Sequence, residues 1–448
     1  MPDLTTSFLG IKTPNPFWLA SAPPTNTGSQ VMRAFEAGWG GAVWKTLGKP
    51  IQNVSSRFGG LDHMGKKIIG FNNIELITDR SIEINLKEME EVKKRYPKNT
   101  LVASLMVESR EEWREIIAQV EGVGADALEL NFGCPHGMCE RGMGSAVGQE
   151  PKLLKTIAGW AKEFSKVPVI VKLTPNITDV TVPAQAARDG GADAVSLINT
   201  IKSLIGVDLD QFVPYPTVAG KSTNGGYCGP AVKPIALHMV AAIARQQNNA
   251  FPISGIGGVS SWKDAVEFFL LGATTVQVCT AVMHYGYRII EDMLQGLSDY
   301  MDEKGFKSVN EMVGKAIPNF TDWGSLDLNY HQVAVIHEEH CIGCNLCVVA
   351  CDDGGHQCIT PGKNGKKAPD SVSSEQQPFS HLHPSRSRLH RSVSDLHPIN
   401  PPAVKSQAVH APVVHEPECV GCNLCMLVCP APGAITMQQA PKPSLSLH

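Results

Sequence analysis

The sequence predicts an α/β fold in which a (β/α)8 TIM barrel is followed by a small α+β domain. Three observations support this prediction. Short apolar segments alternate with amphipathic helical segments between residues 15 and 280, polar side chains follow several of the apolar segments, and the alternation stops after about residue 316. Eight alternating units within about 270 residues fit a closed barrel better than an open, doubly wound sheet.

Each expected strand is a short apolar run, as is typical of parallel strands that are buried on both faces. Helical periodicity marks the segments between them: Ile82, Leu86 and Met89, for example, share one helix face. We expect strands at Pro16–Ser21, Gly41–Lys45, Leu101–Leu105, Ala127–Asn131, Val169–Lys172, Ala194–Asn199, Pro252–Gly255 and Thr275–Cys279, and helices at Ser81–Arg95, Glu111–Val120, Leu153–Phe164 and Lys233–Arg245. The long stretch between the second and third strands includes residues 71–77 and is expected to be functional, because long loops in compact domains are seldom idle.

The composition is that of a chain with a large buried core. Its 448 residues are 43% hydrophobic and 18% charged, which suits one large domain and a smaller one. A net charge of -4 argues against nucleic acid as the main partner. No run approaches the roughly 18 apolar residues of a membrane span, and no basic segment precedes an apolar one near the N-terminus, so we expect neither membrane insertion nor export. We therefore expect a cytoplasmic protein whose 13 cysteines need another explanation than disulfides.

The motif Asn131-Phe-Gly-Cys134-Pro-His comes directly after the fourth strand. The carboxyl ends of the strands form the active-site face of a TIM barrel. A thiol there can donate a proton, and an amide can hold a polar ring that has its own N–H and C=O groups. A buried packing cysteine is the alternative interpretation.

Polar residues also follow other expected strands, at Lys45, Lys172 and Asn199-Thr200. In a barrel these side chains would gather at one rim, and two lysines there favour an anionic or electron-rich cofactor. Solvated lysines and turn asparagines are the alternative for any single position.

Glycines follow the seventh strand at Gly257-Gly258, and the eighth runs into Cys279-Thr280. In TIM barrels these two loops commonly bind phosphate through backbone N–H groups, although two glycines also suit a simple tight turn. The chain contains neither G-x-G-x-x-G nor G-x-x-x-x-G-K-[ST], so nothing indicates a dinucleotide or P-loop site. A mononucleotide, most simply FMN, is therefore the expected cofactor.

Two four-cysteine runs lie near the C-terminus. Their spacing, C-x-x-C-x-x-C-x-x-x-C, is typical of ferredoxins with two [4Fe–4S] clusters, in which the fourth cysteine of each run ligates the other cluster. Structural zinc is the alternative, but it does not need three evenly spaced thiols followed by a fourth. We expect Cys341, Cys344, Cys347 and Cys429 to hold one cluster, and Cys419, Cys422, Cys425 and Cys351 to hold the other.

We expect a barrel over residues 1–315, a connector over 316–330 and a ferredoxin-like domain over 331–438. Residues 359–414 are rich in Ser, Pro and His and contain Phe379 as their only aromatic residue of the Phe, Tyr and Trp types. Such a segment buries too little apolar surface to offset its ordering entropy, so we predict a disordered insertion, and likewise a disordered tail over 439–448. The histidines of the insertion could bind a metal, but a solvated linker is the favoured interpretation; they are His381, His383, His390, His397 and His410.

These residues resemble the pyrimidine-reducing part of the dihydropyrimidine dehydrogenase family over about 1–358 and again over 416–438. Dihydroorotate dehydrogenases share the barrel and a similar Asn-x-x-Cys-Pro motif but usually lack a fused ferredoxin domain. Three features depart from the family: Gly133 where fused eukaryotic enzymes typically carry serine, Asp352 where the simple ferredoxin run has proline after its fourth cysteine, and the long insertion. The matching text is Asn15-Pro-Phe, Leu19-Ala-Ser, Ala34-Phe-Glu-Ala-Gly-Trp-Gly, Lys45-Thr46, Asn72-Asn-Ile-Glu-Leu-Ile, Asn131-x-x-Cys134-Pro-His-Gly-Met, Lys172-Leu-Thr-Pro-Asn, Asn199-Thr200 and Gly257-Gly258.

The resemblance implies roles for individual residues, with Cys134 as the general acid. It implies that FMN is bound by Ala20, Ser21, Lys45, Thr46, Asn131, Lys172, Gly257, Gly258, Cys279 and Thr280. It implies that a pyrimidine is bound by Asn73, Glu75, Ile77, Asn131, Asn199 and Thr200.

A flavin accepts hydride and an iron–sulfur cluster carries single electrons, so together they link hydride chemistry to electron relay. The expected function is reversible reduction of uracil or thymine to the 5,6-dihydropyrimidine. Because the chain lacks a dinucleotide fingerprint, we expect NAD(P)H to deliver electrons through an FAD- and NAD(P)-binding reductase subunit, in a heterotetramer.

Two other functions stay open. One is oxidation of dihydroorotate, whose carboxylate would need a cation beyond the two flavin lysines. The other is an electron-transfer flavoprotein module that transforms no small molecule; such a relay needs no proton donor like Cys134.

Overall fold

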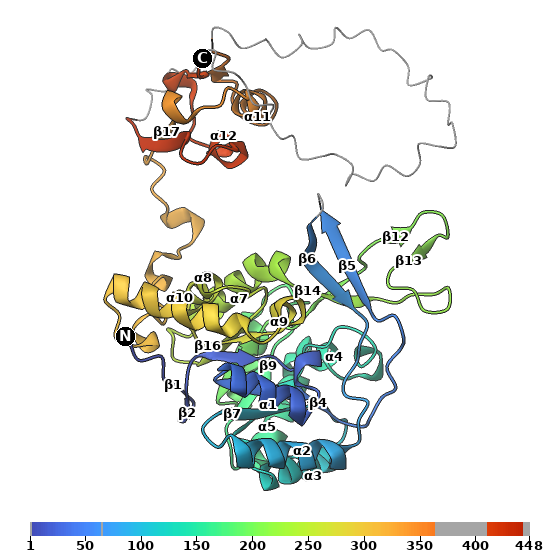
Figure 1. Cartoon of the computed structure of the whole chain (residues 1–448). Coiled ribbons are helices and arrows are strands. Elements are labelled where there is room, and N and C mark those ends of the chain that lie inside the picture. The colour runs from blue at the N-terminus through green and yellow to red at the C-terminus, as the bar shows by residue number, and fades with distance from the viewer. Residues whose placement is uncertain (1, 64–65, 363–409, 442–448) are drawn as a thin grey trace. The chain divides into compact units, whose positions relative to one another are not determined.

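The computed structural model describes residues 2–63, 66–362 and 410–441 (Figure 1). The chain forms two compact units, Met1–Phe320 and Thr321–His448. Within the described residues, no helix has both the length and the apolar composition needed to cross a bilayer.

The first unit is built on a closed barrel of eight parallel strands that follow one another around the barrel in chain order. The predicted TIM-type barrel is therefore confirmed, and each predicted strand segment overlaps one barrel strand. The strands are β3 (Phe17–Leu19), β4 (Gly41–Leu47), β7 (Thr100–Leu105), β8 (Ala127–Asn131), β9 (Val169–Lys172), β10 (Ala194–Leu197), β15 (Ile253–Ile256) and β16 (Ala273–Val278).

Amphipathic helices connect the barrel strands and bury their apolar faces against them. The four helices predicted from periodicity correspond to α2, α3, α5 and α7. Hydroxyl groups cap several helices, and Ser109 and Ser261 form capping boxes with Glu112 and Asp264, which satisfies backbone N–H groups that the first turn leaves free. The helices are α1 (Gly28–Ala37), α2 (Ile82–Arg95), α3 (Arg110–Gly122), α4 (Ser145–Gly148), α5 (Pro151–Phe164), α6 (Thr181–Asp189), α7 (Lys233–Gln246), α8 (Trp262–Leu270), α9 (Thr280–Tyr285) and α10 (Ile289–Lys304).

The barrel interior changes from apolar to polar along the strands. Near their amino ends, Trp18, Val43, Val102 and Ile170 form a buried cluster. Phe8, from the hairpin of β1 (Thr6–Phe8) and β2 (Ile11–Thr13), joins that cluster. Farther along, the buried side chains that meet across the barrel are polar; they are Glu129, Lys172, Ser196, Ser254, Thr275 and Gln277. The polar chemistry of the barrel therefore lies toward the carboxyl ends of its strands.

Insertions after the second and sixth barrel strands form a separate antiparallel sheet, in the order β11-β14-β6-β5. The sequence did not predict this sheet; it indicated only that residues 71–77 would be functional. The sheet places Asn73, at the end of β6, opposite Gly226 of β14. Its strands are β5 (Phe58–His63), β6 (Lys66–Asn73), β11 (Ile201–Ser203) and β14 (Gly225–Cys228), and a further hairpin consists of β12 (Val207–Asp208) and β13 (Val213–Pro214) (Figure 1).

The second unit contains two similar halves. In each half a C-x-x-C-x-x-C segment leads into a helix. The residue directly before the helix is an asparagine with left-handed backbone angles, Asn345 in one half and Asn423 in the other. Two short antiparallel strand pairs join the halves. The elements are β17 (Gln332–Ile336), α11 (Leu346–Gly354), β18 (Ile359–Thr360), β19 (Val413–Val414), α12 (Leu424–Val428) and β20 (Ile435–Gln439).

The bounds predicted for the two disordered segments include residues that are part of the folded unit. Ile359 pairs with Val414 and Thr360 with Val413, so both ends of the predicted 359–414 insertion belong to the folded unit. Apolar side chains at these ends bury in the unit's core, which is why they pair despite the polar composition between them. Gln439, the first residue of the predicted tail, pairs with Gln332. Residues 363–409 and 442–448, with four of the five histidines considered as metal ligands, lie outside the described residues.

Candidate active site

A single cavity at the carboxyl ends of the barrel strands collects the residues singled out from the sequence. Strand ends, the loops that follow them and the β11-β14-β6-β5 sheet all contribute to its wall. Every predicted substrate, cofactor and catalytic residue lines it: Ala20, Ser21, Lys45, Thr46, Asn73, Glu75, Ile77, Asn131, Cys134, Lys172, Asn199, Thr200, Gly257, Gly258, Cys279 and Thr280.

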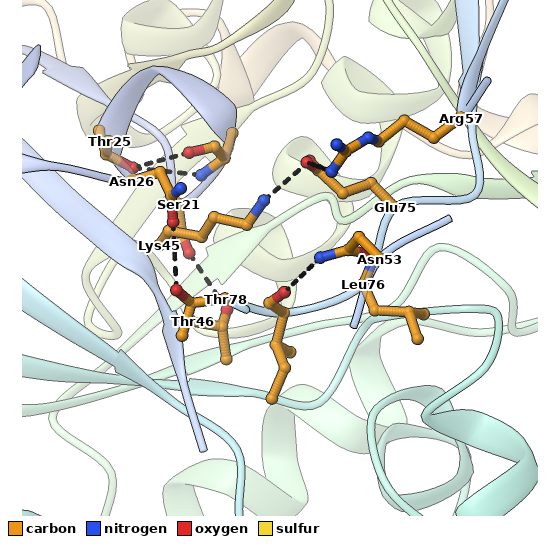
Figure 2. Close-up of polar contacts among 12 residues, drawn as sticks. Ser21, Thr25, Asn26, Lys45, Thr46, Asn53, Arg57, Glu75, Leu76 and Thr78 are labelled. Atoms are coloured by element: carbon orange, nitrogen blue, oxygen red, sulfur yellow. Dashed lines mark hydrogen bonds and ion pairs between the residues drawn. The ribbon is translucent and has the colours of Figure 1, made fainter. Parts of the chain in front are cut away.

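Hydrogen bonds fix the asparagines at this face. The Asn131 amide donates to the Thr46 hydroxyl at 3.0 Å, and Asn199 donates to the Asn131 carbonyl oxygen at 2.9 Å. Thr46 also meets Ser104 at 2.9 Å and Ser21 at 3.1 Å, the latter contact being visible in Figure 2. Each of the two amides keeps one N–H outside these bonds, so both can still bind a polar ligand in a fixed orientation.

Asn199 owes its position partly to a glycine. A Cβ atom added at Gly133 would lie 2.4 Å from the Asn199 Cβ, far inside van der Waals contact. Residue 133 is therefore glycine because the Asn131-to-Cys134 turn passes directly over Asn199, the residue that orients Asn131.

A buried carboxylate joins two cations at the wall of the cavity. Glu75 lies 2.8 Å from the Lys45 ammonium and 2.9 Å from the Arg57 guanidinium, and Figure 2 shows the two cations approaching its carboxylate from opposite sides. The Glu75 side chain is only 11% exposed, so the ion pairs are shielded from solvent. Sequence analysis missed Arg57, which does not line the cavity but is held against it by Glu75.

A second charged pair lies deeper in the barrel. Lys172 is 3.4 Å from Glu129, and both side chains are almost fully buried. Glu129 also accepts hydrogen bonds from Ser196 at 2.8 Å and from Gln277 at 3.0 Å. This network fixes the Lys172 side chain in the cavity wall. Glu129 was overlooked because it is a single acidic residue in an otherwise apolar strand.

Cys134 is a buried thiol held at the edge of the cavity. Its sulfur contacts the His136 carbonyl oxygen at 3.5 Å, and its own carbonyl oxygen accepts a hydrogen bond from the Ser145 N–H. Burial raises the pKa of the thiol to about 11, so Cys134 carries its proton at neutral pH. Cys139 belongs to a short 3-10 turn, Cys139–Arg141, and is not part of the cavity wall.

Two further thiols, Cys228 and Cys279, lie in the same wall. Burial raises the pKa of both, that of Cys279 to about 12. Cys228 contacts Thr280 and Asn73, which lower its pKa in part. Both therefore remain protonated at neutral pH, and Cys228 is a cavity thiol that the sequence analysis did not single out.

The Gly257-Gly258 turn requires glycine at both positions. Their φ angles of 129° and 75° lie in the left-handed region, and a Cβ on either would come within 2.8 Å of a side chain of the preceding helix α7. The bare backbone of this turn lines the cavity together with Cys279 and Thr280, as expected for a phosphate-binding wall.

Three buried polar atoms of the wall have no hydrogen-bond partner among the described residues: His136 Nδ1, Gln277 Oε1 and His284 Nε2. Buried polar atoms are normally paired, so their presence indicates that a polar ligand or water completes the site. Two lysines, a glycine turn and these unpaired atoms together fit a polar, anionic cofactor such as FMN.

In the second unit the cysteine runs line two small cavities. One is lined by Cys341, Cys344, Cys347 and Cys429. The other is lined by Cys351, Cys419, Cys422 and Cys425, and also by Cys358, which sequence analysis left without a role. Each cavity thus gathers three cysteines of one run and the fourth of the other. Among the described residues, no three His, Cys, Asp or Glu side chains converge closely enough to hold a single metal ion.

Comparison with known proteins gives consistent matches. The dihydroorotate dehydrogenase family model matches residues 3–301. The NAD-dependent dihydropyrimidine dehydrogenase subunit PreA of Escherichia coli K12 is 45% identical over 362 residues, covering 80% of this chain and 87% of that protein. A chloroplastic dihydropyrimidine dehydrogenase (NADP(+)) of Arabidopsis thaliana is 44% identical over 71% of this chain and 78% of its own length. The catalytic subunit of dihydroorotate dehydrogenase B (NAD(+)) of Pyrococcus horikoshii is 35% identical over 70% of this chain and 98% of its own.

Proposed function

This chain belongs to the dihydroorotate dehydrogenase family, and from that premise we propose that it is the catalytic subunit of a dihydropyrimidine dehydrogenase, which reduces uracil or thymine reversibly to the 5,6-dihydropyrimidine. The observation that supports this function best is the single cavity that is lined both by a buried, protonated thiol, Cys134, and by three asparagines, Asn73, Asn131 and Asn199. A uracil ring offers alternating N–H and C=O groups, which amides can match as donors and acceptors together.

The residues of the chain have distinct tasks in this reaction. When bound, FMN supplies the hydride chemistry, and Lys45, Lys172, Thr46 and the Gly257-Gly258 turn are the groups suited to hold it. The asparagines fix the ring by its amide edges, so that C5 and C6 stay at reacting distance. The Cys134 thiol gives its proton to C5 as the C5–C6 double bond is reduced, and in the reverse direction the thiolate takes that proton back.

The charges around Glu75 favour a neutral pyrimidine over dihydroorotate. A carboxylated substrate needs a free cation in the pocket, but Lys45 and Arg57 both pair with Glu75. The Glu75 carboxylate itself would repel a substrate carboxylate. Sequence identity agrees, being 45% to a dihydropyrimidine dehydrogenase subunit and 35% to a dihydroorotate dehydrogenase subunit. A pure electron-transfer module is less suited, because it has no use for a proton donor beside an amide-lined pocket.

The second unit is proposed to carry two [4Fe–4S] clusters, one at each cysteine-lined cavity. They supply one-electron transfer between the barrel and an FAD- and NAD(P)-binding reductase subunit, in a cytoplasmic heterotetramer. Support comes from the relatives described as subunits and from the absence of a dinucleotide fingerprint in this sequence.

The test of the function uses the chain without its reductase. The anaerobically purified chain should reduce uracil when given an artificial low-potential donor such as reduced methyl viologen, yet oxidise NADH or NADPH only at a trace rate. The reason is that the proposed pyrimidine pocket is not accompanied by a dinucleotide fingerprint in this sequence. Orotate in place of uracil is the matched control and should give little turnover. Rapid NADH oxidation by the pure chain would overturn the two-subunit proposal, and preferential turnover of orotate would overturn the substrate assignment.

Cofactor content is a separate prediction. Anaerobically purified protein should contain about eight irons, about eight inorganic sulfides and about one FMN per chain, because each cluster holds four irons. Metal analysis by mass spectrometry and flavin release by heat would measure these. Two zinc ions without sulfide would instead support the structural zinc alternative.

A further inference from the structure

The second unit contains nine cysteines, although two [4Fe–4S] clusters require eight. The ninth, Cys358, lies four residues beyond the end of α11 and is 4% exposed. It lines the same cavity as Cys351, Cys419, Cys422 and Cys425. The other cavity has only four cysteines in its wall. The two otherwise similar halves of this unit therefore differ by one thiol.

Cys358 is in contact with one of the proposed ligands. Its sulfur lies 3.6 Å from the Cys351 sulfur, and its backbone N–H donates to that sulfur at 3.3 Å. The Cys358 sulfur also faces Cys419, another proposed ligand of the same cluster. The extra thiol is thus directed toward the proposed ligands, within the buried core of this unit to which Cys351 and Cys419 also belong.

Backbone contacts hold Cys358 where it is. Its carbonyl oxygen accepts a hydrogen bond from the His415 N–H at 2.8 Å, and the next residue, Ile359, pairs with Val414 in the β18–β19 ladder. The residue therefore belongs to the junction between the two halves, and contacts other than those to Cys351 also hold it there.

We propose that Cys358 is a reserve ligand of the second cluster, the one at the cavity lined by Cys351, Cys419, Cys422 and Cys425, and that it becomes the fourth thiolate when Cys351 is not bound. In the exchange, the iron–sulfur bond to Cys351 breaks, the bond to Cys358 forms, and the thiol proton of Cys358 passes to Cys351; no electron moves. The proposal rests on the presence of the two clusters proposed above. It also accounts for Asp352, which stands where a simple ferredoxin run has proline: the segment after Cys351 leads to a second thiol that can bind iron.

The experiment compares Cys351→Ala with Cys429→Ala, the corresponding fourth cysteine of the other cavity, which has no spare thiol beside it. Both variants, Cys358→Ala and the double variant Cys351→Ala/Cys358→Ala are purified anaerobically. Iron, sulfide and FMN are counted, and electron paramagnetic resonance spectra are recorded before and after reduction. FMN content reports whether the barrel is intact.

Cys351→Ala should keep about eight irons with an altered signal from the reduced second cluster, and Cys358→Ala should keep about eight with the wild-type signal. Cys429→Ala and the double variant should lose at least one iron and show an oxidised three-iron signal or an absent cluster. If Cys351→Ala loses as much iron as Cys429→Ala, for whatever reason, Cys358 cannot replace Cys351 and the inference is wrong. Wild-type protein with fewer than about eight irons would contradict the cluster assignment itself, which separates the two failures.

Discussion

Replacing Cys134 by alanine should slow pyrimidine reduction by roughly 10²–10⁴-fold, which is the usual contribution of a positioned general acid. FMN content and pyrimidine affinity should stay near wild type, because the thiol contacts a backbone carbonyl and not the amides that hold the ring. Single-turnover reduction with a low-potential donor measures the step directly and separates it from electron supply.

Serine at this position should be nearly as poor as alanine, since a hydroxyl is a much weaker acid than a thiol. Burial raises the pKa of the Cys134 thiol from 9.0 to about 11, so the proton-bearing form persists as the pH rises. The wild-type rate should therefore be level across neutral pH and fall only as the pH approaches 11.

Two cysteines serve as controls for this assignment. Cys139→Ala lies outside the cavity and should keep almost the full rate. Cys228→Ala removes a thiol that lines the same cavity. If this variant loses as much of the reduction rate as is expected for Cys134→Ala, the proton donor is Cys228 and not Cys134.

Substituting Glu129 by glutamine should destabilise the barrel by about 3–5 kcal/mol, the usual effect of removing one partner from a buried ion pair. The Lys172 ammonium would remain inside the barrel without its counter-ion, 3.4 Å from a neutral amide. Because folded proteins are stable by only about 5–15 kcal/mol, the variant should unfold at a much lower urea concentration. Circular dichroism during urea titration of flavin-depleted protein measures the change without the stabilisation that bound FMN would add.

Two companion variants separate the charge from the hydrogen bonds. Ser196→Ala removes only a hydrogen bond to the same carboxylate and should cost about 1 kcal/mol. Glu129→Gln/Lys172→Met removes the stranded charge and should regain most of the lost stability. A double variant as unstable as Glu129→Gln would show that the loss comes from packing and not from the unpaired lysine.

The barrel could be predicted from the sequence because its strands are local apolar runs. Topology then did the rest: once eight such runs close into a barrel, residues that follow different strands, such as Lys45, Asn131 and Lys172, must meet at one rim. The position of each residue at the end of a strand was therefore enough to predict that these residues lie close together, without any knowledge of side-chain contacts.

The parts that escaped prediction depend on pairing between distant or very short segments. The sheet beside the cavity joins β6 to β14, and Asn73 donates to Gly226 across 153 positions of the chain. The β18 and β19 strands have two residues each, too few to show a period, and lie at the ends of a polar stretch. Arg57 and Glu129 were missed for a related reason: one charged residue in a loop or strand gives no sign of the partner that the fold brings to it.

The contact between Gly133 and Asn199 means that these two positions cannot vary independently. With 2.4 Å available, any side chain at 133 displaces Asn199, and with it the bond that orients Asn131. Serine at 133 is compatible only with a turn or an asparagine placed differently from this one. The two sites should therefore covary among relatives, and in a combinatorial library substitutions at 133 should survive only in company with changes at or around 199. If position 133 or position 199 alone is exchanged between two relatives, the resulting protein should be non-functional. If the segments around both positions are exchanged together, it should remain functional.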